Sequence, residues 1–187
     1  MRHQELTTGR ATIGALPSRD LNLAEHVCLA AVADGARHGW AIGTMLSPDA
    51  EIGRIWTLSR PLTYRAVDEL VERGLLTRRG TEAGRGRDRT VLQITAAGRR
   101  ALAAWLDTPV EHVRDVRTEL LLKLTLRQRA GMGSAALLRA QRDRLAPAID
   151  ALTAGGSSDD LVARWRRESA RAVRRFVDGA LRVAESE

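Results

Sequence analysis

The sequence predicts a mainly α-helical protein: a winged helix-turn-helix domain with a two-stranded wing, plus an α-helical C-terminal dimerisation domain. Three observations support this fold class. Over residues 56–98 a helical segment precedes two short apolar strands and a new helix start. Arginines crowd the turn between the two strands. Beyond Pro109 the pattern changes to long amphipathic helices, so we expect an N-terminal extension over 1–19, the winged helix over 20–109 and the dimerisation domain over 110–187.

Composition limits the class of protein further. The chain has 187 residues, 44% hydrophobic content and a formal net charge of +7. No apolar run approaches the roughly 20 residues that span a bilayer, and residues 1–19 lack the apolar stretch of a secretory signal. Cys28 is the single cysteine, which excludes an intrachain disulfide and a cysteine-based metal cage. We therefore expect a cytoplasmic protein with no membrane partner, no metal and no cofactor.

Two helices open the predicted winged helix. The first starts near Leu21, with Asp20 or Asn22 as its cap, and ends before Gly35. The second covers about 38–46 and ends at the Ser-Pro-Asp of 47–49. Cys28 lies inside the first apolar helix, which indicates a small core residue; a redox sensor is the alternative.

The third helix is the candidate reader of DNA. Thr57 or Ser59 caps it and Pro61 lies in its first turn, where the missing N–H costs little. Helical spacing buries one stripe (Thr63, Ala66, Val67 and Leu70) and leaves another surface (Arg60, Tyr64, Arg65 and Asp68). Gly74 ends the helix.

Strands over 75–79 and 90–94 follow, and Thr95 caps a fourth helix that runs to about Leu106. Three C-terminal helices complete the chain: one from Val113, one over 134–153 with a bend at Pro147, and one over 159–184. Their apolar area exceeds what one subunit buries easily, so a homodimer is predicted. The expected dimerisation residues are Leu120, Leu124, Trp165, Ala172, Phe176 and Val183.

Local charge places the candidate DNA site on the third helix and the wing. Residues 54–89 hold nine arginines against five acids. Arg60 and Arg65 suit bidentate contacts to guanine or clamps on phosphate, and Ser59 suits a phosphate. Tyr64 suits a phosphate or a thymine methyl group. In the wing, the candidates are Arg85, Arg87 and Arg89, while Arg78 and Arg79 lie closer to the strand.

The same residues also allow interpretations without DNA binding. The third helix could carry an ordinary solvated face, with Tyr64 half-buried, and the wing could be a solvated hairpin tip. Trp40, Trp56 and Trp105 could line a pocket for a small aromatic effector between the two domains, or serve as core and interface anchors. The four histidines are far apart and no nucleophile, acid–base pair or phosphate loop is visible, so no enzyme is predicted.

The chain resembles the PadR-type transcriptional regulators. The resemblance rests on Leu29 with His38-Gly-Trp40, Tyr64-Arg-Ala-Val67 with Leu70-Val-Glu-Arg-Gly-Leu-Leu76, and Ile94-Thr-Ala-Ala-Gly98 with Ala104-Trp-Leu106. The long tail from Arg117 is similar to the larger branch of the family, shared with virulence-gene activators. The resemblance implies a homodimer on a two-fold DNA operator, most often a repressor and sometimes released by a small effector. It implies that Ser59, Arg60, Tyr64, Arg65 and the 85–89 wing face double-stranded DNA.

The leading hypothesis is thus a sequence-specific DNA-binding transcriptional regulator. Two alternatives are a small-molecule sensor and a protein-interaction adaptor, each using the winged-helix scaffold.

Overall fold

The structure, a computed structural model, describes residues 20–82, 89–154 and 160–186. The predicted N-terminal extension, 1–19, lies outside them. The elements are, in order, α1 (Leu23–Ala33), α2 (Gly39–Met45), α3 (Arg60–Glu72), β1 (Leu76–Glu82), β2 (Arg89–Ile94), α4 (Ala96–Asp107), η1 (Val113–Asp115), η2 (Val116–Leu120), α5 (Leu121–Arg129), α6 (Ala135–Thr153) and α7 (Leu161–Ala184). The mainly α-helical class with a two-stranded sheet is confirmed. In this described part no helix is both long and apolar enough to cross a membrane.

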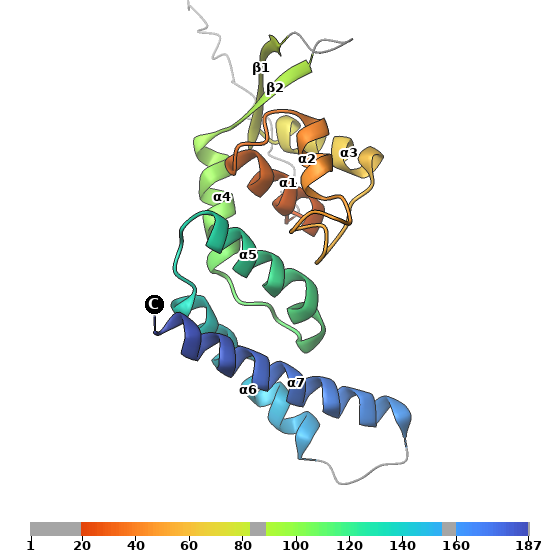
Figure 1. Ribbon diagram of the computed structural model, residues 1–187, viewed down its shortest axis with the longest axis vertical. Helices are drawn as coiled ribbons and strands as arrows, with labels where there is room; N and C mark the ends of the chain where they lie inside the picture. Colours follow the sequence, from red (N-terminus) through yellow and green to blue (C-terminus); the bar gives the residue numbers. More distant parts are fainter. Residues whose placement is uncertain (1–19, 83–88, 155–159, 187) are drawn as a thin grey trace, which may run out of the picture.

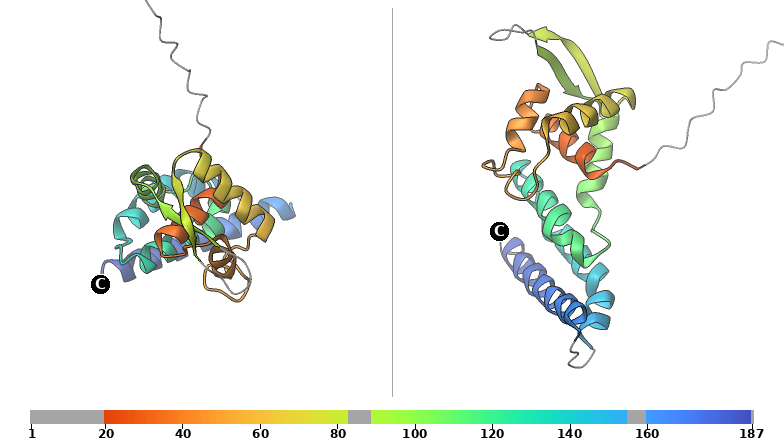
Figure 2. Two further views of the ribbon diagram at one scale, coloured as in Figure 1. Left: turned by 90° about the horizontal axis from the view of Figure 1, so that it is seen from above. Right: turned by 90° about the vertical axis from the view of Figure 1, so that its right-hand side faces the viewer.

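The molecule is elongated (Figure 1). The wing projects at one end, next to α1, α2 and α3, and α4 leads away from it toward the opposite end. Helix α5 lies in the middle, and the α6–α7 hairpin forms the far end, as the side view in Figure 2 also shows.

Local signals set the helix starts of the winged helix. Asn22 caps α1 through a reciprocal pair of bonds: its side chain accepts from the Glu25 N–H at 3.0 Å, and the Glu25 carboxylate accepts from the Asn22 N–H at 2.9 Å. Ser59 is the N-cap of α3 with Pro61 in the first turn, and Thr95 caps α4 by accepting from the Gly98 N–H. Each of these starts agrees with the sequence prediction.

Two hydrophobic cores run along the chain. The first is built by α1–α4 and the sheet and also takes Leu122 and Leu126 from α5. The second is built by α6, α7 and the segment before α5, including Val110 and Leu120. Helix α5 therefore joins both cores. Gly98 is needed where α4 approaches the sheet, because a Cβ there would lie 2.2 Å from the Leu75 carbonyl oxygen.

The first C-terminal helix differs from its predicted regular form. Residues 113–115 form a 3₁₀ turn and 116–120 a π-helical turn before α5 begins at Leu121. A wider turn shifts the helix face that follows it. Leu120 packs in the second core and Leu122 in the first, since two residues two positions apart point to opposite sides of a helix. Pro147 lies inside α6, where a bend was predicted.

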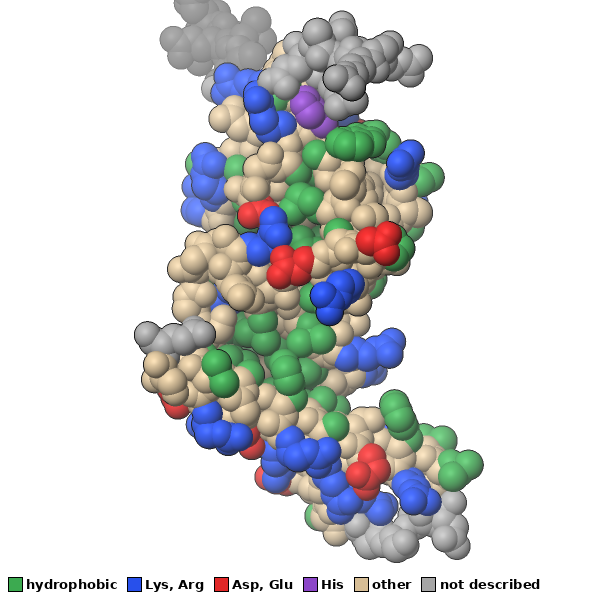
Figure 3. All heavy atoms as spheres, viewed as in Figure 1, with side chains coloured by type: hydrophobic (Ala, Val, Ile, Leu, Met, Phe, Trp, Pro, Cys, Tyr) green, Lys and Arg blue, Asp and Glu red, His purple; other side chains and the backbone are tan. Residues whose placement is uncertain are grey.

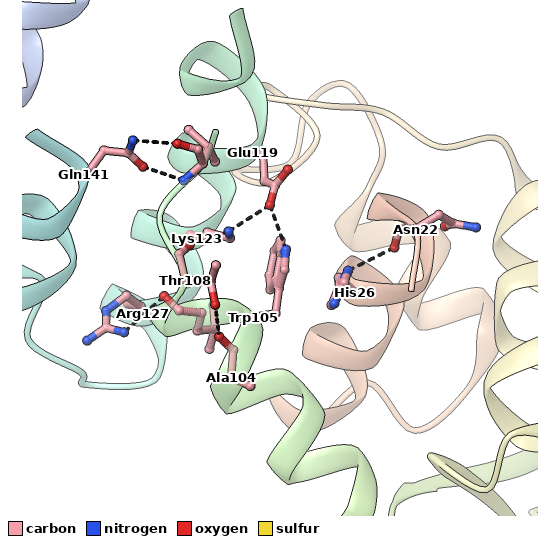
Figure 4. Close-up of polar contacts among 11 residues, drawn as sticks. Asn22, His26, Ala104, Trp105, Thr108, Glu119, Lys123, Arg127 and Gln141 are labelled. Atoms are coloured by element: carbon pink, nitrogen blue, oxygen red, sulfur yellow. Dashed lines mark hydrogen bonds and ion pairs between the residues drawn. The ribbon is translucent and has the colours of Figure 1, made fainter. Parts of the chain in front are cut away.

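Two buried cations of α5 hold the C-terminal end of α4 (Figure 4). Lys123, 1% exposed, donates to the Thr108 carbonyl at 2.7 Å and pairs with the Glu119 carboxylate at 2.8 Å. Its ammonium also lies 5.1 Å from the centre of the Trp105 ring. The partners of this buried charge are thus Trp105 in α4, Thr108 directly after α4, and Glu119 in the η2 turn that precedes α5.

Arg127 lies one turn further along α5. Its guanidinium donates to the Leu106 carbonyl at 3.3 Å, pairs with the Asp107 carboxylate at 2.5 Å and also contacts the Gly133 carbonyl at 3.1 Å. The last carbonyls of a helix carry partial negative charge and have no partner within the helix. Lys123 and Arg127 together supply both the hydrogen bonds and the positive charge that this end of α4 needs.

Candidate nucleic-acid interface

Helix α3 presents one polar face to the surface. Thr63, Ala66, Val67 and Leu70 are buried, as their spacing predicts, while Arg60, Tyr64 and Arg65 are exposed. Among the described residues, neither Arg60 nor Arg65 forms an ion pair. Two guanidinium groups that are not neutralised on one helix face are suited to phosphate oxygens or to the acceptor atoms of guanine.

The N-terminus of α3 lies at the edge of this face. Ser59 is exposed, and its hydroxyl makes no capping bond to the first turn. The free N–H groups of that turn and the Ser59 hydroxyl therefore remain available as hydrogen-bond donors. This is the combination that a phosphate group requires.

Asp68 on the same face is neutralised from the wing. The guanidinium of Arg78, on β1, forms an ion pair with the Asp68 carboxylate of α3. Without that partner, the carboxylate would repel a nucleic-acid backbone. Arg78 thus serves the α3 face, a role for which the sequence offered no signal, because the two residues meet only through the turn between helix and strand.

Tyr64 is held against the start of α2. It is 51% exposed, and a Cβ added at Gly39 would lie 2.6 Å from the Tyr64 Cε1 atom. The ring can take this position only because residue 39 is glycine. Tyr64 is therefore half-packed, with one side on α2 and the other open to solvent.

The base of the wing is tied to the helices on both sides. The strands pair antiparallel, with Leu76 opposite Ile94 and an irregularity between Arg78 and Thr81. The Leu92 N–H donates to the Arg37 carbonyl at 2.7 Å, and His38 Nδ1 donates to the Thr90 carbonyl at 3.0 Å. Of the predicted wing contacts, Arg85 and Arg87 lie outside the described residues. Arg89 begins β2, but its side chain is not described.

The three tryptophans predicted to line an effector pocket are not brought together. Trp105 borders a cavity of about 690 Å³ between α1, α4 and the segment that leads to α5, together with His26, His112 and Lys123. Trp56 packs against the first core, and Trp40 is exposed on α2; neither lines this cavity.

Both faces of Trp105 are covered inside its own chain. The His26 ring stacks on it, with centroids 4.7 Å apart, and its Nε1–H donates to Glu119 at 2.9 Å (Figure 4). Burial lowers the pKa of His26 from 6.5 to about 4, against the raising effect of its bond to the Asn22 carbonyl. The imidazole is therefore neutral at pH 7. A lone lysine four residues after a glutamate, on an apolar helix, was the sequence signal for this cluster.

Cys28 is fully buried in the first core. Burial, with a smaller contribution from the nearby Glu25 carboxylate, raises the pKa of its thiol to about 12. The thiolate is the reactive form, so this position opposes the redox-sensor interpretation. Within the described segments, no group of three or more His, Cys, Asp or Glu side chains is placed to hold a metal ion.

Helix α7 has two apolar faces. Ala170, Val177 and Leu181 are buried against α6. A second stripe is exposed and consists of Leu161, Val162, Trp165, Ala172, Phe176 and Val183. Hydrophobic side chains gather at the N-terminal end of this helix, at the lower right of Figure 3. Of the other predicted dimerisation residues, Leu120 is completely buried in its own subunit and Leu124 is partly buried.

Comparison with known proteins finds a family model that matches part of the chain. Residues 28–104 match the model of the transcriptional regulator PadR-like family. Bacillus subtilis PadR in complex with operator DNA is similar at 20% identity and a TM-score of 0.46, over 87% of this chain and 99% of that one. The Vibrio cholerae virulence activator AphA is similar at 22% sequence identity and a TM-score of 0.38, over 87% of this chain and 94% of that one. Bacillus subtilis PadR in complex with p-coumaric acid is similar at 19% sequence identity and a TM-score of 0.42, over 88% of this chain and 99% of that one. Among curated proteins none matches.

The buried His26 makes stability depend on pH. Because its pKa is about 4 in the folded protein and 6.5 in the unfolded chain, the unfolded chain takes up the proton first. The free energy of unfolding should therefore fall as the pH drops from about 6.5 to about 4. His26→Phe keeps a ring on Trp105 but has no proton to bind, so it should lose less stability over this range. Denaturant unfolding of both proteins across the range checks this; identical pH profiles would contradict it.

Proposed function

We propose that this protein, whose residues 28–104 belong to the PadR-like family of transcriptional regulators, binds a two-fold DNA operator as a homodimer and represses transcription. One observation carries the DNA-binding part. Among the residues that the structure describes, Arg60 and Arg65 form no ion pair on the exposed surface of α3. They lie beside an N-terminus whose donors are available, and Asp68 on the same surface is paired with Arg78.

The chemistry of the site matches a double helix. An α-helix fits the major groove, and side chains near its N-terminus reach the base edges. Arg60 lies in the first turn of α3, and Arg65 lies a little over one turn further along. Arg85, Arg87 and Arg89 complete the proposed site from the wing, where they would contact phosphates or the minor groove.

Substitution of the reading arginine tests this site. Arg60→Ala should cost about 1–3 kcal/mol of binding free energy and relax specificity at one base pair. Arg87→Ala should instead weaken binding evenly across sequences and lower its salt dependence. Footprinting and titration on DNA upstream of the protein's own gene and its neighbours measure both. Arg139→Ala, at an ion pair with Glu185 far from α3, is the control. If Arg60→Ala and Arg87→Ala both bind like the wild type, the proposed site is wrong.

The homodimer is proposed from the exposed stripe of α7. Trp165, Ala172, Phe176 and Val183 are spaced by seven, four and seven residues, the repeat by which one helix packs against another. Trp165 is 72% exposed and Val183 is 63% exposed. Large apolar side chains aligned along a whole helix mark an association surface rather than a solvated one. A second copy of α7 is the simplest partner for a two-fold operator.

A charge on this stripe should separate the subunits. Trp165→Glu removes an anchor of the kind that dominates interfaces, so we expect a loss of at least about 2 kcal/mol in dimer stability. Sedimentation at a series of concentrations measures the subunit equilibrium. Arg164→Glu places the same side chain on the neighbouring residue, off the stripe, and should leave the dimer intact. Dimerisation of the Trp165→Glu variant at wild-type strength would exclude this surface.

Release by a small aromatic effector is proposed from the cavity beside Trp105. This cavity lies between the winged helix and the segment that carries the C-terminal helices. A ligand bound there would alter the relation of the two parts, and so the spacing of two reading helices in a dimer. The ligand would contact the edge of the Trp105 ring, since His26 and Lys123 lie over the ring itself.

Filling the cavity tests the effector proposal. Ala104, an exposed residue of α4, lines the cavity. In the wild type, an aromatic compound from a panel that includes p-coumaric acid should bind in calorimetry and weaken operator binding. Ala104→Trp should bind the operator normally but no longer respond to that compound. No response from the wild type to any compound, or an unchanged response in the variant, would contradict the proposal.

A further inference from the structure

Leu62 is an exposed apolar side chain in the first turn of α3. It is the third residue of this helix and is 50% exposed. Neither the buried members of the two hydrophobic cores nor the partly buried residues packed against them include Leu62. A single exposed leucine is ordinary on a protein surface. What Leu62 does therefore depends on its place on the helix.

Helical spacing puts Leu62 between two polar residues of the exposed surface. Ser59 precedes it by three residues and Arg65 follows it by three, so the three side chains are neighbours along one row of α3. All three are exposed. Leu62 thus lies between a hydroxyl suited to a phosphate and a guanidinium suited to guanine.

The other edge of this surface meets α2. A Cβ built on Gly39 would lie 2.6 Å from the Tyr64 ring, and one built on Gly43 would lie 3.9 Å from the Arg60 Cγ atom. Leu62 precedes Tyr64 by two residues and so points about 160° away from it around the helix. Leu62 and Tyr64 therefore mark the two edges of the exposed surface, with Arg65 between them.

The side chain of leucine limits what Leu62 can recognise. It has no hydrogen-bond donor or acceptor, so it makes no polar contact with a phosphate or a base edge. The apolar group that a base pair presents in the major groove is the C5-methyl group of thymine. Residues in the first turns of a reading helix are the ones that reach the base edges.

We propose that Leu62 packs against the methyl group of a thymine in each half-site and so makes that thymine part of the operator sequence. The inference rests on the proposed function, because it needs α3 to be the reading helix. It adds a base preference of the opposite chemistry to that of the arginines. Arg65 reads a polar base edge, whereas Leu62 reads an apolar one.

Deoxyuridine tests this contact, because it differs from thymidine only by the missing C5-methyl group. The DNA is the sequence that the full chain enriches from random DNA, with each thymine replaced in turn by deoxyuridine. We expect one thymine in each half-site to be sensitive to the replacement. Loss of its methyl group in one half-site should weaken wild-type binding about fourfold, which corresponds to the burial of one methyl group.

Variants of Leu62 connect that methyl group to the side chain. Leu62→Ala keeps a good helix former but removes the apolar contact. It should bind the operator more weakly and should no longer distinguish thymidine from deoxyuridine at the sensitive position. Leu62→Met retains an apolar side chain and should keep the discrimination. Arg65→Ala is the matched control on the same row: it should lose affinity but still discriminate about fourfold. Unchanged melting temperatures show that the variants remain folded.

The outcomes separate this inference from the proposed function. If the wild type enriches an operator but tolerates deoxyuridine at every thymine, the contact is excluded and the regulator function stands. Full discrimination by Leu62→Ala would also overturn the contact. Discrimination that is lost in Tyr64→Ala but kept in Leu62→Ala would assign the methyl group to Tyr64 instead. If the wild type enriches no DNA at all, both the function and the contact fail.

Discussion

The C-terminal end of α4, held by two buried cations of α5, determines how the two halves of the molecule are joined. Lys123 and Arg127 donate to the Thr108 and Leu106 carbonyls, and each pairs with a carboxylate. A buried cation is costly unless it is paired and hydrogen-bonded, and these partners have fixed directions. The contact therefore favours one orientation of α5 on α4. Because α4 begins where the wing ends, the same contact fixes the C-terminal helices relative to the α3 face.

This orientation matters for a two-fold target. Two reading helices must enter major grooves that face the same side of the duplex, about 34–36 Å apart or a multiple of that distance. In the proposed dimer, α7 supplies the contact between subunits and α3 the contact with DNA. The α4–α5 junction therefore sets where α3 lies relative to α7. The cavity beside Trp105 adjoins this junction, so a ligand there would act on the element that sets the spacing.

Local signals predicted much of the winged helix. Asn22, Ser59 and Thr95 mark helix starts by their side-chain chemistry, and the stripe from Thr63 to Leu70 follows helical spacing; the structure has each of them. The exposed α7 stripe also follows from spacing alone. Such features depend on residues within one or two turns of one another, which is the range that a sequence pattern can resolve.

The rest depends on pairs distant in the chain. The ion pair of Arg78 with Asp68 and the stacking of His26 on Trp105 arise only when separate elements meet. Likewise, composition grouped Trp40 with Trp56 and Trp105, although Trp40 is exposed on α2 and does not line the cavity beside Trp105.

Enrichment of random DNA by the protein is the most direct measurement of operator binding by a homodimer. The enriched sequence should be two-fold symmetric, with half-sites one helical turn, or a multiple of it, apart. Failure to enrich any sequence, or enrichment of a single asymmetric site, would contradict it.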